Sequence, residues 1–109
     1  MAEGLDITGT YGNEAGCKFA TTHEPTEDMQ FITASEYRTY AALCSFIQVI
    51  KVNDFTRVMT SICASEGEAT ETVEMLRLQK DPFGGDSWTL YNANGDDWGV
   101  YPKCGPTRD

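Results

Sequence analysis

The sequence predicts an all-β fold, a small antiparallel barrel or sandwich of seven or eight short strands with at most one short helix. Short apolar runs alternate with turn-forming residues along the whole chain, a pattern typical of antiparallel sheets. The 109 residues are too few for two self-sufficient cores, so residues 1–109 are expected to form a single domain. Four widely spaced cysteines predict two disulfides, which stabilise small cores.

The first half of the chain supplies three predicted strands and the one short helix. Apolar and polar residues alternate over residues 5–11, which predicts a first strand; residues 17–20 are expected to begin the returning strand, and residues 29–33 are a further short strand candidate. Glycine-rich and polar stretches between them predict a turn and an exposed loop: residues 12–16 and 21–28. Ser35 can cap a single helical turn over residues 35–40, because its hydroxyl can accept from free backbone donors.

The second half contains the clearest strand signals. Residues 44–52 and 55–63 are rich in β-branched and aromatic side chains, and Asn53-Asp54 between them predicts a tight turn. These two segments therefore form the best-supported hairpin of the prediction. Residues 70–79 combine strand alternation with helix-forming residues, and we favour a strand because sequential strands usually pair.

The last predicted hairpin joins residues 87–91 to residues 98–101 through a turn at residues 92–97. Its oxygen donors resemble part of a calcium loop, but the residues an EF-hand requires at positions six and twelve are missing, so a turn is favoured. Aromatic residues concentrate here: Phe83, Trp88, Tyr91, Trp98 and Tyr101. Most are expected in the core or barrel wall, although an interior lined by them is an alternative site for a small apolar ligand.

The cysteines are Cys17, Cys44, Cys63 and Cys104, and no two are close enough in sequence to form half of a typical zinc site. Disulfides are therefore expected, and no metal or other cofactor. Three pairings are possible, and we prefer Cys17–Cys44 with Cys63–Cys104, which join neighbouring segments of a meander. Such bridges indicate an oxidising compartment, the periplasm or the extracellular space.

The chain has no recognisable export signal. Met1 before Ala2-Glu3-Gly4 is interpreted as an initiator added to a mature N-terminus from which an export signal was removed. Residues 1–4 are accordingly expected to be disordered or not native.

The formal charge of −9 argues against binding to nucleic acid or to membrane surfaces, which are both anionic. It favours a cationic protein partner, although excess carboxylates also simply keep a small protein soluble. No catalytic residue is assigned, because the single histidine, His23, lies in a polar stretch with no nucleophile at a recognisable spacing.

Acidic residues gather in three predicted turns, which could form one rim at an end of the barrel: Glu24, Glu27 and Asp28; Glu66 and Glu68; Asp96 and Asp97. Trp98 or Phe83 beside such a rim could provide the buried anchor that charge alone does not. The predicted partner-binding residues are therefore Phe83, Asp96, Asp97 and Trp98.

Residues 7–11, Ile-Thr-Gly-Thr-Tyr, look like the opening Gly-x-Trp strand of lipocalin-like barrels, with tyrosine in place of tryptophan. With Cys17 and a final Tyr-x-x-Cys at Tyr101 and Cys104, the chain resembles small exported bacterial lipocalin-like barrels. These include periplasmic inhibitors of proteases or of lysozyme and proteins of unknown function. The resemblance implies a barrel fold, and it assigns no inhibitory residue to a position in this sequence.

We therefore expect an exported, non-enzymatic binding module, an inhibitor or recognition protein for a cationic protein. The alternative is a carrier of a small apolar ligand in the barrel interior. The sequence leaves the oligomeric state open.

Overall fold

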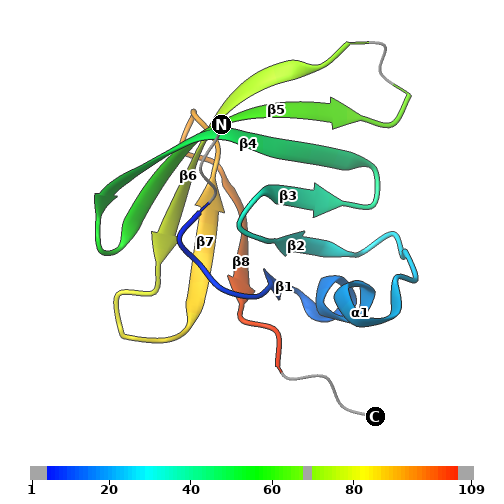
Figure 1. Cartoon of the computed structure of the whole chain (residues 1–109), viewed down its shortest axis with the longest axis horizontal. Helices are drawn as coiled ribbons and strands as arrows, with labels where there is room; N and C mark the ends of the chain where they lie inside the picture. Colours follow the sequence, from blue (N-terminus) through cyan, green and yellow to red (C-terminus); the bar gives the residue numbers. More distant parts are fainter. Residues whose placement is uncertain (1–4, 68–69, 106–109) are drawn as a thin grey trace.

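The computed structural model describes residues 5–67 and 70–105, and it confirms the all-β prediction. Eight antiparallel strands follow one another in chain order in one sheet that curls into a nearly closed barrel (Figure 1). The strands are β1 (Tyr11–Gly12), β2 (Gln30–Ile32), β3 (Glu36–Thr39), β4 (Ala42–Asn53), β5 (Thr56–Ser65), β6 (Thr72–Lys80), β7 (Ser87–Tyr91) and β8 (Asp97–Pro102). One helix, α1 (Glu14–Thr22), lies between β1 and β2.

The best-supported hairpin of the prediction is present as β4 and β5, the two longest strands. Side chains on β5 alternate strictly between the barrel interior and its outer surface, as a strand with one buried face requires. Two register shifts in β4 accommodate the extra residues of this strand. The strand predicted over residues 70–79 and the last hairpin are also confirmed, as β6 and as β7 with β8.

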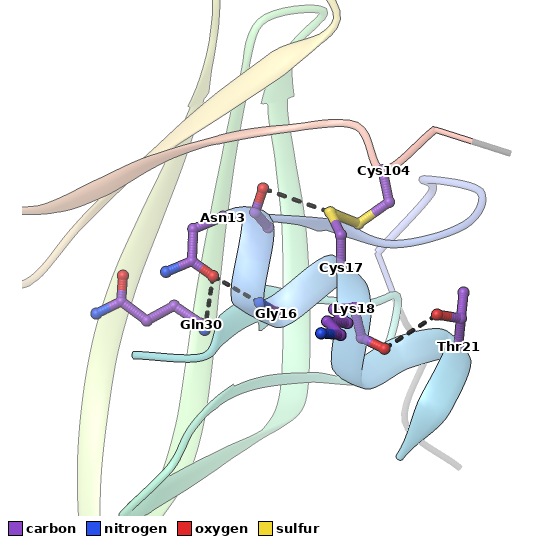
Figure 2. Close-up of a disulfide and its surroundings, with 8 residues drawn as sticks. Asn13, Gly16, Cys17, Lys18, Thr21, Gln30 and Cys104 are labelled. Atoms are coloured by element: carbon purple, nitrogen blue, oxygen red, sulfur yellow. Dashed lines mark hydrogen bonds between the residues drawn. A yellow bond between two sulfur atoms is a disulfide. The ribbon is translucent and has the colours of Figure 1, made fainter. Parts of the chain in front are cut away.

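The helix α1 corrects the prediction of a turn and a strand over residues 12–20. Asn13 caps this helix, because its side-chain Oδ1 accepts a hydrogen bond from the backbone of Gly16 at 2.7 Å. The same oxygen accepts from the backbone of Gln30 at 3.0 Å and so ties the helix to β2 (Figure 2). Glu14 in the first turn adds a favourable interaction with the helix dipole. The helix ends at His23, which has a positive φ of 61°.

Two further segments differ from the predicted elements. Of residues 5–11 only Tyr11 is in a strand, and residues 5–10, which we call the strap, run across the barrel toward β1 (Figure 1). The helical turn predicted after Ser35 is instead strand β3, in which Tyr37 points into the core and pairs with Cys44. Burial of Tyr37 and pairing on both sides of the strand outweigh the weak capping signal of Ser35.

Every strand contributes at least one buried side chain to the core in the barrel interior, including Tyr11 from the two-residue β1. The most deeply buried include Ile32, Met59, Leu76, Leu78, Leu90 and Tyr101. The strap adds Leu5 to the same cluster. The prediction that the late aromatic residues lie mostly in the core is confirmed for Trp88 and Tyr101.

Both disulfides form, but their pairing corrects the predicted one: the bridges are Cys17–Cys104 and Cys44–Cys63. Cys44 and Cys63 lie directly opposite each other on β4 and β5. Cys17 on α1 reaches Cys104 just after β8, as Figure 2 shows. The prediction failed because it placed Cys17 on a strand beside Cys44, whereas α1 carries Cys17 to the opposite edge of the sheet.

The barrel closes at what we call the seam, where β1 meets the end of β8. The backbone contacts there are a single bridge between Tyr11 and Lys103 and a 2.8 Å hydrogen bond from the Cys104 nitrogen to the Thr10 oxygen. The Cys17–Cys104 disulfide spans the same seam. The disulfide therefore adds a covalent link where backbone pairing between the two edge strands is short.

The meander defines two ends of the barrel. The helix end carries the connections β1–β2 (with α1), β3–β4, β5–β6 and β7–β8. The strap end carries the connections β2–β3, β4–β5 and β6–β7, and the strap contacts this end through Ala34 and Arg57. Within the described part of the chain no helix has the length and hydropathy to cross a membrane.

Candidate functional site

The structure separates the predicted partner-binding residues. Phe83 lies in the β6–β7 connection at the strap end, whereas Asp96 and Asp97 lie at the β7–β8 turn at the helix end. Strand β7 stands between the two connections, so these residues cannot form one continuous contact surface. Each end must therefore be considered separately.

Phe83 is the most exposed large apolar side chain among the described residues, with 94% of its surface open to solvent. Its loop is held by Asp81, whose carboxylate accepts hydrogen bonds from the backbone nitrogens of Phe83 at 2.9 Å and Gly85 at 3.2 Å. A side chain at position 85 would collide with the Asp81 carboxylate, so glycine is required for this arrangement. These two bonds hold the backbone of the loop at and just after Phe83, which lowers the entropic cost of ordering the loop on binding.

A second exposed phenylalanine lies beside this loop. Phe55, in the β4–β5 turn, exposes 50% of its surface, and its carbonyl oxygen accepts from the Lys80 nitrogen at 2.7 Å. Phe55 and Pro82 line the same surface hollow of about 240 Å³. We call Phe55, Pro82 and Phe83 the tip. It combines two exposed aromatic rings with a hollow between two hydrogen-bonded connections.

Trp98 occupies a different environment from the one predicted for it. It is half-buried, and its ring lies 5.9 Å from that of Tyr37, on the wall of the core. Its carbonyl oxygen accepts a 2.6 Å hydrogen bond from the Tyr101 hydroxyl group, which also lies 3.0 Å from the Tyr37 hydroxyl group. Burial raises the pKa of both tyrosines above its ordinary value. Trp98 therefore packs against the core and is not an exposed anchor for a partner.

The acidic clusters all lie at the helix end but do not form one compact rim. The loop after α1, the end of β5 and the β7–β8 turn point to different sides of the molecule (Figure 1). Glu24, Glu27, Asp28 and Glu66 are exposed, and Glu68 lies outside the described residues. These acids form a diffuse negative field at one end of the barrel.

The β7–β8 turn is stabilised by its own polar groups. The Asn92 side-chain oxygen accepts from the backbone nitrogens of Asn94 and Asp96, and Gly95 has a positive φ of 86°. Asp97 accepts from the Gly99 nitrogen at 2.6 Å. These bonds support the predicted turn. No cluster of three potential metal ligands is found in residues 5–67 and 70–105.

Sequence reasoning missed an ion pair at the strap end, between the buried Arg57 and the half-exposed Asp6. The Arg57 side chain on β5 points inward, and its Nε donates to Asp6 Oδ1 of the strap at 2.7 Å. Hydrogen bonding to Arg57 is the main cause that holds the pKa of Asp6 below its ordinary value. A usable signal existed, since Arg57 is an even number of residues from Cys63 and so shares its inward face.

The outer surface of the barrel has a second apolar region. Ile50, Val73 and Met75 project from the outer face of β4 and β6 and are exposed. They are regular strand positions on a sheet face and lack the hydrogen-bonded loops of the tip. They provide a matched control for experiments on the tip.

Fold and bridges together define a small up-and-down β-barrel with two disulfides, a filled interior and two unlike ends. Comparisons with protein-family models, curated proteins and solved structures find no match to the chain.

Proposed function

We propose that this protein is an exported, non-enzymatic binding module that recognises another protein through the tip. The observation that carries the proposal is Phe83, a nearly fully exposed aromatic side chain on a loop fixed by Asp81. Exposed aromatic residues on rigid supports are common energetic centres of protein interfaces. The two disulfides fit an oxidising compartment and so support export.

The proposed partner is a cationic protein. A net charge of −9 attracts a basic partner over a long range and speeds its association. The acids concentrate at the helix end, whereas the tip carries the apolar anchors. In this proposal charge therefore governs the rate of encounter, and Phe83 governs the lifetime of the complex.

The filled interior argues against the alternative of a carrier with a preformed cavity. Met59, Leu76, Leu78 and Leu90 are fully buried against one another in the centre of the barrel. A small ligand would have to displace part of the protein in order to enter.

The test is binding to a panel of basic proteins, including lysozymes and basic serine proteases, measured by surface plasmon resonance at low and at physiological salt. We expect Phe83→Ser to weaken binding by about 30-fold, the effect of losing about 2 kcal/mol at an interface anchor. Val73→Ser, which removes an exposed apolar side chain from the outer face, should bind as the unaltered protein does.

Two results would contradict the proposal. One is the absence of binding to every basic protein even at low salt. The other is a complex that Phe83→Ser leaves unchanged, because the anchor would then lie elsewhere.

A further inference from the structure

Basic side chains concentrate around the strap in this acidic protein. Of the seven basic residues that the structure describes, four lie at the strap end: Lys51, Arg57, Lys80 and Lys103. Lys51 and Arg57 are paired across β4 and β5, and Arg57 and Lys80 both lie within 6 Å of the Trp88 ring. The Lys103 Nζ lies 6.0 Å from the ring of Tyr11, where the strap ends. This end of the barrel therefore holds more than half of the described basic residues, beside a similar number of acids.

Several acids lie at the same end, and most have other partners. Asp54 forms an exposed ion pair with Lys51, Asp81 holds the tip, and Asp86 accepts from the Tyr11 hydroxyl group at 2.8 Å. In the described part of the chain, Arg57 has one carboxylate partner, Asp6.

Only 5% of the Arg57 surface is exposed to solvent. A buried guanidinium group without a carboxylate partner would be strongly destabilising. Its Nε and Nη2 donate to the two oxygens of Asp6 at 2.7 and 3.1 Å, and its Nη1 donates to the Asn53 carbonyl at 2.6 Å. The barrel itself supplies the carbonyl oxygen, whereas the carboxylate comes from the strap. The guanidinium group is thus a preformed carboxylate receptor.

The strap that supplies this carboxylate is lightly attached. Leu5 donates a backbone hydrogen bond to Ala34 and buries its side chain in the core, and Thr10 accepts from Cys104. Between these points, residues 6–9 make no backbone–backbone hydrogen bond within the described structure. The Asp6 side chain remains 54% exposed to solvent. An external carboxylate can therefore reach Arg57 without first unfolding a strand.

We propose that the strap covers a binding site for a small carboxylic acid with a short apolar tail. The ligand's carboxylate replaces that of Asp6 on Arg57, and its tail replaces the buried Leu5 side chain in the core cluster. Asp6 and Leu5 of the strap therefore compete with the ligand for Arg57 and for the place of the Leu5 side chain in the core. This inference is independent of the proposed protein-binding tip.

Octanoate is the test ligand, and its neutral counterpart octanol is the control. The NMR signal of the Arg57 Nε–H group and isothermal titration calorimetry report binding near neutral pH. Asp6→Asn removes the competing carboxylate, so we expect it to bind octanoate at least about 10-fold more tightly than the unaltered protein. Asp54→Asn makes the same change of charge at the same end but leaves Arg57 paired, and it should show no such gain.

The proposal is overturned if Asp6→Asn binds octanoate no more tightly than Asp54→Asn, or if octanol gains equally. The unaltered protein provides a test that needs no folded variant: octanoate at high concentration must shift the Arg57 signal, and octanol must not. Phe83→Ser should bind octanoate normally, so failure of the tip and failure of this site are distinguishable.

Discussion

The hydroxyl groups of Tyr37 and Tyr101 form a short hydrogen-bonded chain inside a mostly apolar core. Tyr101 donates its one hydroxyl hydrogen to the carbonyl oxygen of Trp98, so in the bond between the two tyrosines Tyr37 is the donor. The second bond holds the bulged part of β8, where Trp98 lies between the paired residues Asp97 and Gly99. The two tyrosines therefore have unequal roles, since removal of the Tyr101 hydroxyl group leaves both of its partners unpaired.

We predict that Tyr101→Phe lowers the free energy of unfolding by about 2–3 kcal/mol, because two buried polar groups lose their partner. Tyr37→Phe should cost about 1 kcal/mol, since Tyr101 keeps its bond to Trp98. Urea denaturation of the two variants measures both effects. An equal or larger loss for Tyr37→Phe would show that the Tyr101 hydroxyl group is not the central member of this hydrogen-bonded chain.

The same pair predicts a loss of stability in alkali. Burial raises the pKa of both tyrosines, so above about pH 10 the unfolded chain binds fewer protons than the native protein. The free energy of unfolding should therefore fall as the pH rises from about 10 toward the native pKa values. The double variant Tyr37→Phe, Tyr101→Phe should show a flatter dependence in denaturation series. Phenolate absorbance from these residues in the native state would contradict the prediction.

At the scale of elements, the two disulfides close loops of very different length. Cys17–Cys104 spans 87 residues and Cys44–Cys63 spans 19. Chain entropy predicts upper limits of about 4.5 kcal/mol for the longer loop and about 3 kcal/mol for the shorter. Cys44–Cys63 also joins strands that already pair along their whole length. The bridge across the seam should therefore contribute more.

The measurement uses two variants with one bridge each, Cys44→Ala with Cys63→Ala and Cys17→Ala with Cys104→Ala. The difference in unfolding free energy between oxidised and reduced forms of each variant isolates its crosslink from the packing effect of alanine. We predict a larger difference for the variant that keeps Cys17–Cys104. The reverse order would assign the main stabilisation to the hairpin bridge.

The contact of α1 with β2 depends on the absence of a side chain at Gly16. A Cβ there would overlap the carbonyl group of Gln30. Alanine favours a helix over glycine by roughly 1 kcal/mol, but overpacking costs about 1–3 kcal/mol. Gly16→Ala should therefore lower stability in thermal or urea denaturation. Lys18→Ala, on the exposed side of α1, should change it by less than about 0.5 kcal/mol and serves as the control.

The elements that could be predicted are those with strong local signals. Runs rich in β-branched and aromatic residues predicted β4 and β5, and Asn94-Gly95 predicted the turn before β8. Helix α1 was missed because glycine and asparagine dominate its start, although Asn13 and Glu14 form a capping signal. Strand β3 depends on pairing with β2 and β4, which local propensity does not contain.

Part of the disulfide pairing could have been predicted from the sequence. In the predicted hairpin Cys44 lies eight residues before Val52 and Cys63 eight residues after Phe55, so they face each other across the turn. The structure reaches this pairing through a turn displaced by one residue and two register shifts. The binding site was harder to predict from the sequence. Phe83 was identified, but its separation from Asp96 and Asp97 depends on which strand connections lie at the same end of the barrel.

Across the whole molecule, charge is distributed unevenly. The helix end is strongly acidic, whereas the strap end mixes four basic residues with a similar number of acids. The long-range field of the protein is therefore directional. A cationic partner is attracted mainly toward the helix end, even though the tip lies at the other end.

We predict that Asp96→Asn with Asp97→Asn, which changes the net charge from −9 to −7, slows association with a cationic partner. Dissociation should change little, and the difference from the unaltered protein should vanish at high salt. Stopped-flow or surface plasmon resonance separates the two rates. A faster dissociation with unchanged association would instead place these two residues inside the contact.

The seam has a consequence for how the protein fails. Because Tyr11 and Lys103 provide its only strand bridge in the described residues, β1 and β8 have almost no backbone pairing on the sides that face the seam. Reduction of Cys17–Cys104 would leave both strands as sheet edges able to pair with another molecule. The Cys17–Cys104 disulfide would thus prevent polymerisation. A reducing agent would open the barrel into a sheet to which further molecules could add at both edges.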